Sequence, residues 1–216
     1  LAVKKVAVIG GGKYLLFKKL FVARLHGSRF LLKNLFLFPT TATSFYRYNT
    51  SWREVYVHKL PSSERKKIVR IFEQVFRELS YFQPAKVYGK LIEDRGTQVT
   101  FSALGQKAPF ELKKKWVSEN AGIKMKITKR VQKYLPRLEV RAAGYTSIDV
   151  TRKGIDKAYG IRQIERYLKV PKNKMLFIGD ALFKGGNDYA VLKTGVDCMA
   201  VRKPQDTKKI IRAILD

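Results

Sequence analysis

Short, largely apolar runs that end at a glycine, a proline or a charged residue mark several buried strands in this chain. These runs lie at residues 4–9, 35–38, 175–178 and 196–201. Runs of four to six residues are too short for a helix and are typical of parallel strands buried on both faces. Amphipathic helical segments accompany them at residues 14–25, 154–168, 190–194 and 207–215. This alternation predicts an α/β domain with a parallel sheet.

The middle of the chain follows a different pattern, in which apolar and polar residues alternate. The segments 45–48 and 52–57, with Asn49-Thr50-Ser51 between them, predict a hairpin with one exposed face. Ser62 or Ser63 is expected to cap a helix that extends to Leu79. Further strands are predicted at 86–93, 98–104, 138–143 and 147–150, and further helices from Pro109 and at 124–135.

Hairpins combined with helices predict an α+β unit with an antiparallel sheet, inserted between two parts of the parallel one. The expected domains are therefore a core made of residues 1–44 and 150–216, and a cap made of residues 45–149.

The composition fits a globular protein, with 45% hydrophobic and 12% aromatic residues. The single cysteine, Cys198, excludes an intramolecular disulfide and indicates a reducing compartment. With only His26 and His58, a His-rich zinc site is excluded. Neither a signal peptide nor an apolar run of transmembrane length is found in the sequence, so a soluble, cytoplasmic protein without a membrane partner is expected.

The formal net charge of +28 has two interpretations. Lysines and arginines gather on proteins that bind nucleic acid or anionic membranes, because phosphates release counterions on binding. They also spread over solvated helix faces. Only short clusters occur, at Arg65–Lys67, Lys113–Lys115 and Lys208–Lys209, and no nucleic-acid-binding motif is found in the sequence. The second interpretation is favoured, and nucleic acid stays an alternative partner.

Candidate chemistry is densest at residues 175–188, MLFIGDALFKGGND. Asp180 follows the predicted strand, at the edge where open α/β sheets bind ligands. Gly185 and Gly186 allow a sharp turn that brings Asn187 and Asp188 back towards Asp180. Carboxylate and amide oxygens suit Mg²⁺. An Asx turn followed by a helix N-cap is the structural alternative, but the whole string favours a metal site.

This string resembles the fourth motif of the haloacid dehalogenase (HAD) superfamily of phosphatases and phosphomutases, in the subfamily IIB form found in phosphomannomutases. The resemblance implies a Rossmann-like core with a large inserted cap. It also implies that Asp180 binds Mg²⁺ and that Asn187 and Asp188 complete or support the acidic site.

Two further segments resemble motifs of the same superfamily. Gly10, Gly11 and Gly12 follow a predicted strand and open a helix, where backbone N–H groups can bind phosphate. They resemble the second motif, although its Ser or Thr is replaced here by Gly12, and the P-loop spacing is absent. Lys157, in RKGIDKAYGI, resembles the third-motif lysine that balances phosphoryl charge; a solvated lysine is the alternative.

The cap resemblance assigns substrate-binding roles to five residues: Arg95, Gln106, Lys113, Ser147 and Asp149. Gln106 and Lys113 stand where the mutases carry arginines. Only arginine grips phosphate with a bidentate fork, so these two positions tell against a mutase. For Arg95 the alternative is a turn residue facing solvent. The resemblance also leaves open a homodimer formed through the cap.

The DxDGT motif, which supplies the nucleophilic aspartate of the superfamily, is missing, and no DxD occurs in these 216 residues. Covalent catalysis needs an in-line carboxylate. We therefore expect an N-terminally incomplete core that lacks its first strand, or else an inactive relative.

The predicted function is that of a Mg²⁺-dependent phosphatase that acts on a sugar phosphate or a similar small ester through an aspartyl-phosphate. The chain as it stands is expected to be inactive. Phosphomannomutase activity is one alternative, and an inactive relative that binds nucleic acid through its basic surface is another.

Overall fold

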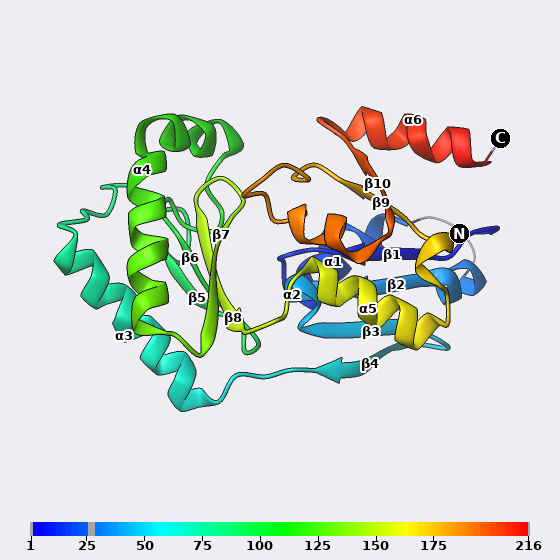
Figure 1. The fold of residues 1–216 in the computed structure, drawn as a ribbon, viewed down its shortest axis with the longest axis horizontal. Helices are drawn as coiled ribbons and strands as arrows, with labels where there is room; N and C mark the ends of the chain where they lie inside the picture. Colours follow the sequence, from blue (N-terminus) through cyan, green and yellow to red (C-terminus); the bar gives the residue numbers. More distant parts are fainter. Residues whose placement is uncertain (1, 26–28, 216) are drawn as a thin grey trace. The chain divides into compact units, whose positions relative to one another are not determined.

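The computed structural model describes residues 2–25 and 29–215. It divides into two compact units, Leu1–Ile155 and Asp156–Asp216, called here the first and the second unit. Figure 1 shows the elements of both, coloured along the sequence.

A mixed four-stranded sheet forms one part of the first unit. Its strands, in spatial order, are β1 (Val6–Ile9), β2 (Leu35–Phe38), β3 (Ser44–Tyr48) and β4 (Trp52–Val57). β1 and β2 are parallel, which brings their C-terminal ends to one edge, whereas β3 is antiparallel to both β2 and β4. All four residues of β2 are buried, as expected for an apolar strand between neighbours.

The predicted hairpin at residues 45–57 forms, but it pairs with β2 and so continues the sheet of β1. The predicted start of the cap at residue 45 therefore falls inside β3. The helical elements around this sheet are α1 (Tyr14–Leu20), η1 (Val22–Arg24), η2 (Arg29–Asn34) and α2 (Pro39–Ala42). The helix expected over residues 14–25 thus ends at Leu20 and is followed by a 3-10 turn.

An antiparallel sheet with two long helices forms the rest of the first unit. The strands, in spatial order, are β5 (Ile92–Asp94), β6 (Val99–Ser102), β8 (Ser147–Arg152) and β7 (Leu138–Ala143). Helices α3 (Ser62–Glu78) and α4 (Phe110–Tyr134) pack beside one another and against this sheet (Figure 1). Phe72 and Phe76 on α3 meet Phe101 on β6 in the core. The predicted antiparallel α+β layer is present.

Three local expectations for this layer are wrong. Pro61, not Ser62 or Ser63, occupies the N-cap of α3, and no side chain caps the helix. The two helices expected from Pro109 and at 124–135 are one continuous helix, α4, with Pro109 at its N-cap. The strand expected at 86–93 is confined to β5.

The second unit contains a separate two-stranded parallel sheet. Its elements are α5 (Lys157–Leu168), η3 (Lys172–Lys174), β9 (Leu176–Gly179), η4 (Tyr189–Thr194), β10 (Asp197–Ala200) and α6 (Pro204–Leu215). α5 begins three residues later than the sequence suggests, because Asp156 is its N-cap and accepts a hydrogen bond from the Tyr159 N–H at 2.7 Å. Lys157 is therefore the first residue of the helix.

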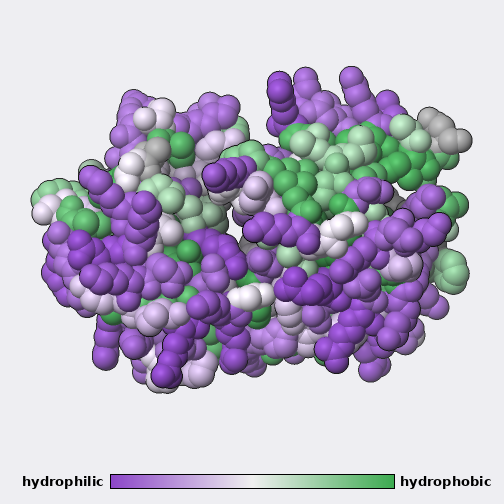
Figure 2. All heavy atoms as spheres, in the orientation of Figure 1, coloured by the Kyte–Doolittle hydropathy of each residue, from purple (hydrophilic) through white to green (hydrophobic). Residues whose placement is uncertain are grey.

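The observed elements give the predicted α/β class, with parallel strands in both units and an antiparallel sheet in the first. The compact units divide after Ile155, whereas the core and cap expected from the sequence divide near residues 44 and 150; that finer division stays a prediction. Within the described ranges, no helix combines the length and apolar character that crossing a bilayer requires. Figure 2 shows hydrophilic residues spread over much of the visible face.

Candidate active site

The loop after β9 returns the chain to the end of that strand. The Asp188 N–H donates to the Ala181 carbonyl at 3.2 Å, and the Gly186 N–H donates to the Phe183 carbonyl at 2.8 Å. Gly185 has a φ of +90°, and a Cβ at Gly186 would lie 2.1 Å from the Ala181 carbonyl oxygen. Gly185 is therefore required because of its backbone conformation, and Gly186 because the Ala181 carbonyl leaves no room for a side chain.

The Asp188 side chain is completely buried and is held from two sides. Its carboxylate accepts a hydrogen bond from the Ala181 N–H at 3.1 Å and pairs with the Lys157 ammonium. A Cβ at Gly179 would lie 2.6 Å from Asp188 Oδ2, so the carboxylate packs directly over the last residue of β9. Asp188 occupies the N-cap of η4 without capping it through its side chain. The capping alternative therefore does not explain this aspartate.

Lys157 is not a solvated lysine. Its side chain is 12% exposed, and its ammonium reaches the buried Asp188 carboxylate, 31 residues further along the chain. The backbone of Lys157 is positioned by the first turn of α5, and its ammonium group is positioned by the ion pair with Asp188. The Lys157 charge therefore has a defined position in the second unit.

Asp180 and Asn187 are exposed in the same loop. Within the described residues, no group of three or more His, Cys, Asp or Glu side chains could hold a metal by itself. Mg²⁺ commonly takes one or two protein carboxylates and completes its shell with water and substrate phosphate. The donor chemistry of the loop fits this ion, with Asp180 and Asn187 as direct oxygen donors and Asp188 as their buried support. These roles stay predictions.

Arg95 organises a second cluster, in the first unit. Its side chain is 10% exposed, which excludes the alternative of a turn residue facing solvent. Its Nε donates to Glu93 at 2.9 Å, Nη1 to the Gly11 carbonyl at 2.6 Å and Nη2 to Gln106 Oε1 at 2.8 Å. The guanidinium therefore ties the β5–β6 hairpin to the glycine loop after β1.

Three more of the predicted substrate-binding residues connect to Arg95 through hydrogen bonds. Gln106 Nε2 donates to Ser102 Oγ at 2.9 Å, and the Ser102 and Ser147 hydroxyls lie 2.6 Å apart. Lys113 Nζ donates to the Gln106 carbonyl at 3.3 Å. The structure therefore brings Arg95, Gln106, Lys113 and Ser147 into one network.

Asp149 lies beside this network and faces the glycine loop. Its Oδ1 accepts from Thr100 at 2.7 Å, and a Cβ at Gly11 would lie 3.9 Å from its Oδ2. Burial raises the pKa of the Asp149 carboxyl, and hydrogen bonds from Thr100 and Gln98 with the nearby Arg95 guanidinium offset this only in part.

The sequence prediction did not include Glu93, Gln98, Thr100 or Ser102. A signal for three of them was present: Gln98, Thr100 and Ser102 alternate with the apolar residues Val99 and Phe101. Alternate residues of a strand share one face, so a strand whose polar face is entirely Gln, Thr and Ser indicates a polar partner there rather than solvent.

The glycine loop is held through its carbonyl groups. The Gly12 carbonyl accepts from the Thr40 N–H and the Gly10 carbonyl from the Thr41 N–H, both at 2.9 Å. Binding of phosphate by the loop's N–H groups, predicted for Gly10, Gly11 and Gly12, stays a prediction. The donors come from a strained turn in which Thr40, Thr41 and Ala42 have φ of 47°, 58° and 63°. A left-handed conformation costs a non-glycine residue about 1–2 kcal/mol, and no pattern in the sequence predicts it at these positions.

Comparison with known proteins decides the family. The sequence profile of the eukaryotic phosphomannomutases matches residues 2–216, nearly the whole chain. The chain belongs to this family. Among its relatives, the phosphomannomutase of Encephalitozoon cuniculi is 30% identical over 186 residues, covering 82% of this chain and 70% of that protein. The phosphomannomutase of Saccharomyces cerevisiae is 27% identical over 147 residues, covering 66% of this chain.

Solved structures of HAD phosphatases share the fold of this family member. An N-terminally truncated, IMP-bound IMP-nucleotidase of Plasmodium falciparum superposes with a TM-score of 0.65 at 18% identity, covering 98% of this chain and 59% of that one. The sucrose-phosphatase of Synechocystis gives a TM-score of 0.52 at 12% identity, covering 94% of this chain and 72% of that one. The match with the yeast phosphomannomutase spans 57% of that protein's length.

Proposed function

We propose that this chain provides the charge-balancing and substrate-binding parts of a Mg²⁺-dependent HAD enzyme that acts on a sugar phosphate or a similar small phosphate ester. The observation that carries the proposal is the buried pair of Lys157 and Asp188 at the end of β9. A cation that is already fixed stabilises charge on a transferring phosphoryl group without waiting for solvent to reorganise.

In this proposal the side chains divide the work as follows. Lys157 balances the charge of the phosphoryl group, and Asp188 holds the Lys157 ammonium in place and supports the metal donors Asp180 and Asn187. Arg95, Gln106, Lys113, Ser147 and Asp149 bind the hydroxyl groups and the remaining phosphate oxygens of the substrate. When bound at Asp180 and Asn187, Mg²⁺ would supply further positive charge at the phosphate. These 216 residues contain no DxD motif, and the proposal assigns the attacking carboxylate to none of them.

A phosphatase is favoured over a mutase by the contacts of Gln106 and Lys113. The Gln106 amide is used by Arg95 and Ser102, and the Lys113 ammonium by the Gln106 carbonyl. Neither side chain offers the bidentate fork with which arginine grips phosphate. Phosphomannomutase activity is the second candidate, because the family and the relatives carry that name.

The expected cytoplasmic location rests on the single cysteine and stays a prediction.

The test joins an N-terminal strand that carries a DxDGT motif to the full chain. Hydrolysis of mannose 6-phosphate and of p-nitrophenyl phosphate is measured with and without Mg²⁺. We expect background rates for the chain alone and Mg²⁺-dependent turnover for the extended chain. Lys157→Met in the extended chain should lower turnover by about 10²-fold or more, while Lys153→Met, at an exposed lysine nearby, should leave it unchanged.

Conversion of mannose 1-phosphate into mannose 6-phosphate by the extended chain would select the mutase alternative. Turnover by the chain alone that survives Asp180→Ala would overturn the proposal, because it would require chemistry that uses neither the upstream aspartate nor the predicted metal ligand.

A further inference from the structure

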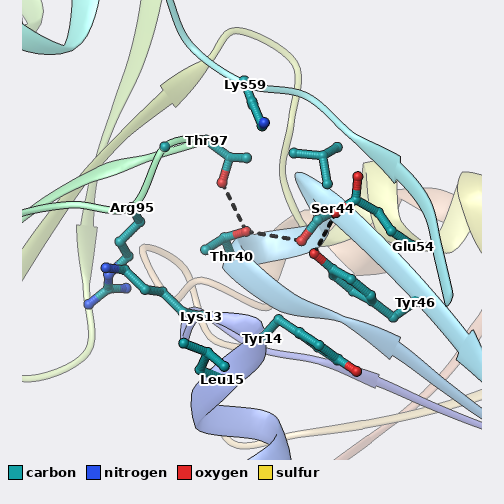
Figure 3. Close-up of a pocket in the computed structure, with 12 residues that line it drawn as sticks. Lys13, Tyr14, Leu15, Thr40, Ser44, Tyr46, Glu54, Lys59, Arg95 and Thr97 are labelled. Carbon is teal, nitrogen blue, oxygen red and sulfur yellow. Dashed lines mark hydrogen bonds between the residues drawn. The ribbon is translucent and has the colours of Figure 1, made fainter. Parts of the chain in front are cut away.

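The pocket of the first unit belongs to the cluster that Arg95 organises, described above. It measures about 280 Å³, and Arg95 lines it together with Lys13, Thr40 and Thr97 (Figure 3). Cationic side chains that have no role in that cluster or in the proposed function lie in the second unit, along α5. Their arrangement fits a different kind of ligand.

The exposed surface of α5 is cationic and aromatic. Within this helix, the exposed side chains are those of Arg162, Arg166 and Tyr167, and the exposed Lys169 follows as its C-cap. Residues three or four positions apart lie on one face of a helix. Arg162, Arg166 and Lys169 therefore form one row. Together with Tyr167, this row is called here the α5 stripe.

Each arginine of the α5 stripe lies over a tyrosine ring. The Arg162 guanidinium is 5.9 Å from the ring centroid of Tyr159, and the Arg166 guanidinium is 5.6 Å from that of Tyr167. Tyr167 is itself 38% exposed. A ring beneath a guanidinium restricts its position and leaves its N–H donors unused. The two arginines can therefore donate to an acceptor that comes from outside the helix.

The charge of the α5 stripe is not neutralised by neighbouring carboxylates. The one acidic residue in the sequence of α5 is Glu165, which is half-buried and pairs with Lys172 of η3 at 3.7 Å. Among the residues that the structure describes, neither arginine of the stripe forms an ion pair. On α3, by contrast, the exposed Glu73 and Glu78 are interspersed among the cations. A cationic row of this kind favours an anionic partner.

A purely structural role explains part of the α5 stripe. The helix dipole stabilises cations at the C-terminal end of a helix, and Arg166 and Lys169 occupy the last turn and the C-cap of α5. The dipole does not account for Arg162, which lies in the middle of the helix. It also does not account for the tyrosine ring beneath each guanidinium.

We propose that the α5 stripe binds single-stranded nucleic acid. Arg162, Arg166 and Lys169 contact phosphates of the strand, and the exposed ring of Tyr167 stacks on a base. Proteins that bind single strands without sequence preference combine a row of cations with aromatic rings in this way. An acidic protein surface supplies carboxylates but no planar bases, so it would leave the tyrosine without a partner. This binding is independent of phosphoryl transfer.

The test measures binding to the full 216-residue chain by fluorescence anisotropy over a range of salt concentrations. The probe is a fluorescein-labelled oligothymidylate of about 20 nucleotides, longer than a typical single-strand site. Arg162→Gln/Arg166→Gln removes two charges from the stripe. Lys66→Gln/Lys67→Gln removes two exposed lysines of α3 and is the matched control for net charge. Tyr167→Leu removes the exposed ring. Unfolding curves establish that each variant is folded.

We expect Arg162→Gln/Arg166→Gln to weaken binding about tenfold or more and to lower the salt dependence, the slope of log K against log salt concentration, by about 1.4, the value for two phosphate contacts on a single strand. The control should weaken binding about twofold at most, through the net charge alone. Equal losses in the two glutamine double variants would overturn the proposal, since attraction would then be a property of the whole surface, whose formal net charge is +28.

Two further measurements test the kind of partner. Tyr167→Leu should weaken binding about fivefold or more, and Arg162→Lys/Arg166→Lys, which keeps the charge but removes the guanidinium planes, should weaken it less than the glutamine variant does. Unchanged binding in Tyr167→Leu would overturn the stacking contact. Polyglutamate of similar length should compete much less well than unlabelled oligothymidylate. Equal competition would overturn the assignment of nucleic acid and favour an acidic protein partner.

A last pair of variants separates this proposal from the proposed function. Asp180→Asn should leave oligothymidylate binding unchanged, and Arg162→Gln/Arg166→Gln should leave the Mg²⁺-dependent turnover of the extended chain unchanged. If the extended chain shows no turnover while the stripe variants weaken oligothymidylate binding as expected, the proposed function fails and the α5 stripe stands. Loss of turnover in Arg162→Gln/Arg166→Gln would place the stripe in the substrate site and would overturn its independent role.

Discussion

The two clusters of polar residues are built in opposite ways. In the second unit, a loop of nine residues and the first turn of α5 bring together a single buried pair, Lys157 with Asp188. In the first unit, Arg95 reaches Gly11 across 84 positions of sequence, and Ser102 reaches Ser147 across 45. The cluster in the second unit concentrates charge at one point, whereas the cluster in the first unit spreads polar contacts over amides, hydroxyls and one guanidinium.

This difference determines how each cluster should respond to change. A buried ion pair keeps its stability only while both partners remain, because either charge alone is costly to bury. A network of hydrogen bonds loses one contact at a time, each with a net contribution of about 0.5–1.5 kcal/mol. Single substitutions should therefore separate the two clusters clearly.

The largest effect is expected from breaking the buried pair. Asp188→Ala leaves the Lys157 ammonium, 12% exposed, without its partner, and should lower the free energy of unfolding of the second unit by about 3–5 kcal/mol. The measurement is hydrogen-exchange protection of the β9 and β10 amides, because Trp52 and Trp116 both belong to the first unit and their fluorescence reports on it.

The double variant Lys157→Met/Asp188→Leu removes both charges and is the control. It should recover most of the lost protection, since no charge is left buried. A cost below about 1 kcal/mol for Asp188→Ala, the range of exposed pairs, would show that the pair is solvated and that the contrast between the two clusters is wrong.

A smaller effect should come from the loop that returns Asp188 to β9. A Cβ at Gly186 would lie 2.1 Å from a backbone oxygen, so Gly186→Ala must move the main chain and should cost about 1–3 kcal/mol. Gly185→Ala meets no atom within 4 Å but adopts a φ of +90°, and should cost about 1 kcal/mol. Chemical unfolding followed by circular dichroism compares them. A larger cost for Gly185→Ala would show that conformation, not close approach, limits this loop.

The second unit was largely predictable from sequence because its contacts are local. A short apolar strand followed by GDxxxxGGND predicted that Asp188 returns to the strand end, and the loop hydrogen bonds have this form. The pairing of Asp188 with Lys157 was not predicted, because the resemblance gave each residue a separate role. Local spacing shows where a carboxylate lies, but not which of several cations it contacts.

The first unit was predictable in its elements and much less in their pairing. The alternation of apolar and polar residues identified the hairpin at 45–57. It did not identify β2 as the strand that pairs with this hairpin, with Phe36 opposite Arg47 and Leu37 opposite Tyr46, because no local pattern encodes that pairing. The left-handed turn at Thr40 was hidden for a similar reason. β-branched residues disfavour that conformation, and long-range bonds to Gly12 and Thr97 hold it.

The smallest expected effect is a change in how steeply the free energy of unfolding varies with pH. It concerns Asp149, in the polar cluster of the first unit. Burial raises the pKa of its carboxyl above the ordinary value of 3.8, against the opposing influence of Thr100, Arg95, Gln98 and Arg141. A group with a raised pKa in the folded state contributes stability that is fully present below pH 3.8. That contribution is lost as the pH rises through the raised value. Since one proton is involved, this group cannot lower the free energy of unfolding by more than about 1.4 kcal/mol per pH unit.

Asp149→Asn should therefore remove this decline, so that the difference in unfolding free energy between the variant and the parent chain grows in favour of the variant as the pH rises above about 4. The measurement is urea unfolding of the first unit, followed by tryptophan fluorescence, at intervals from pH 4 to pH 8. Thr100→Val should act in the opposite sense: it removes a hydrogen bond that lowers the Asp149 pKa, and so extends the decline to higher pH. Parallel profiles for the parent chain and both variants would show that water reaches Asp149 freely, and that the hydroxyl and amide network around it does not set its protonation.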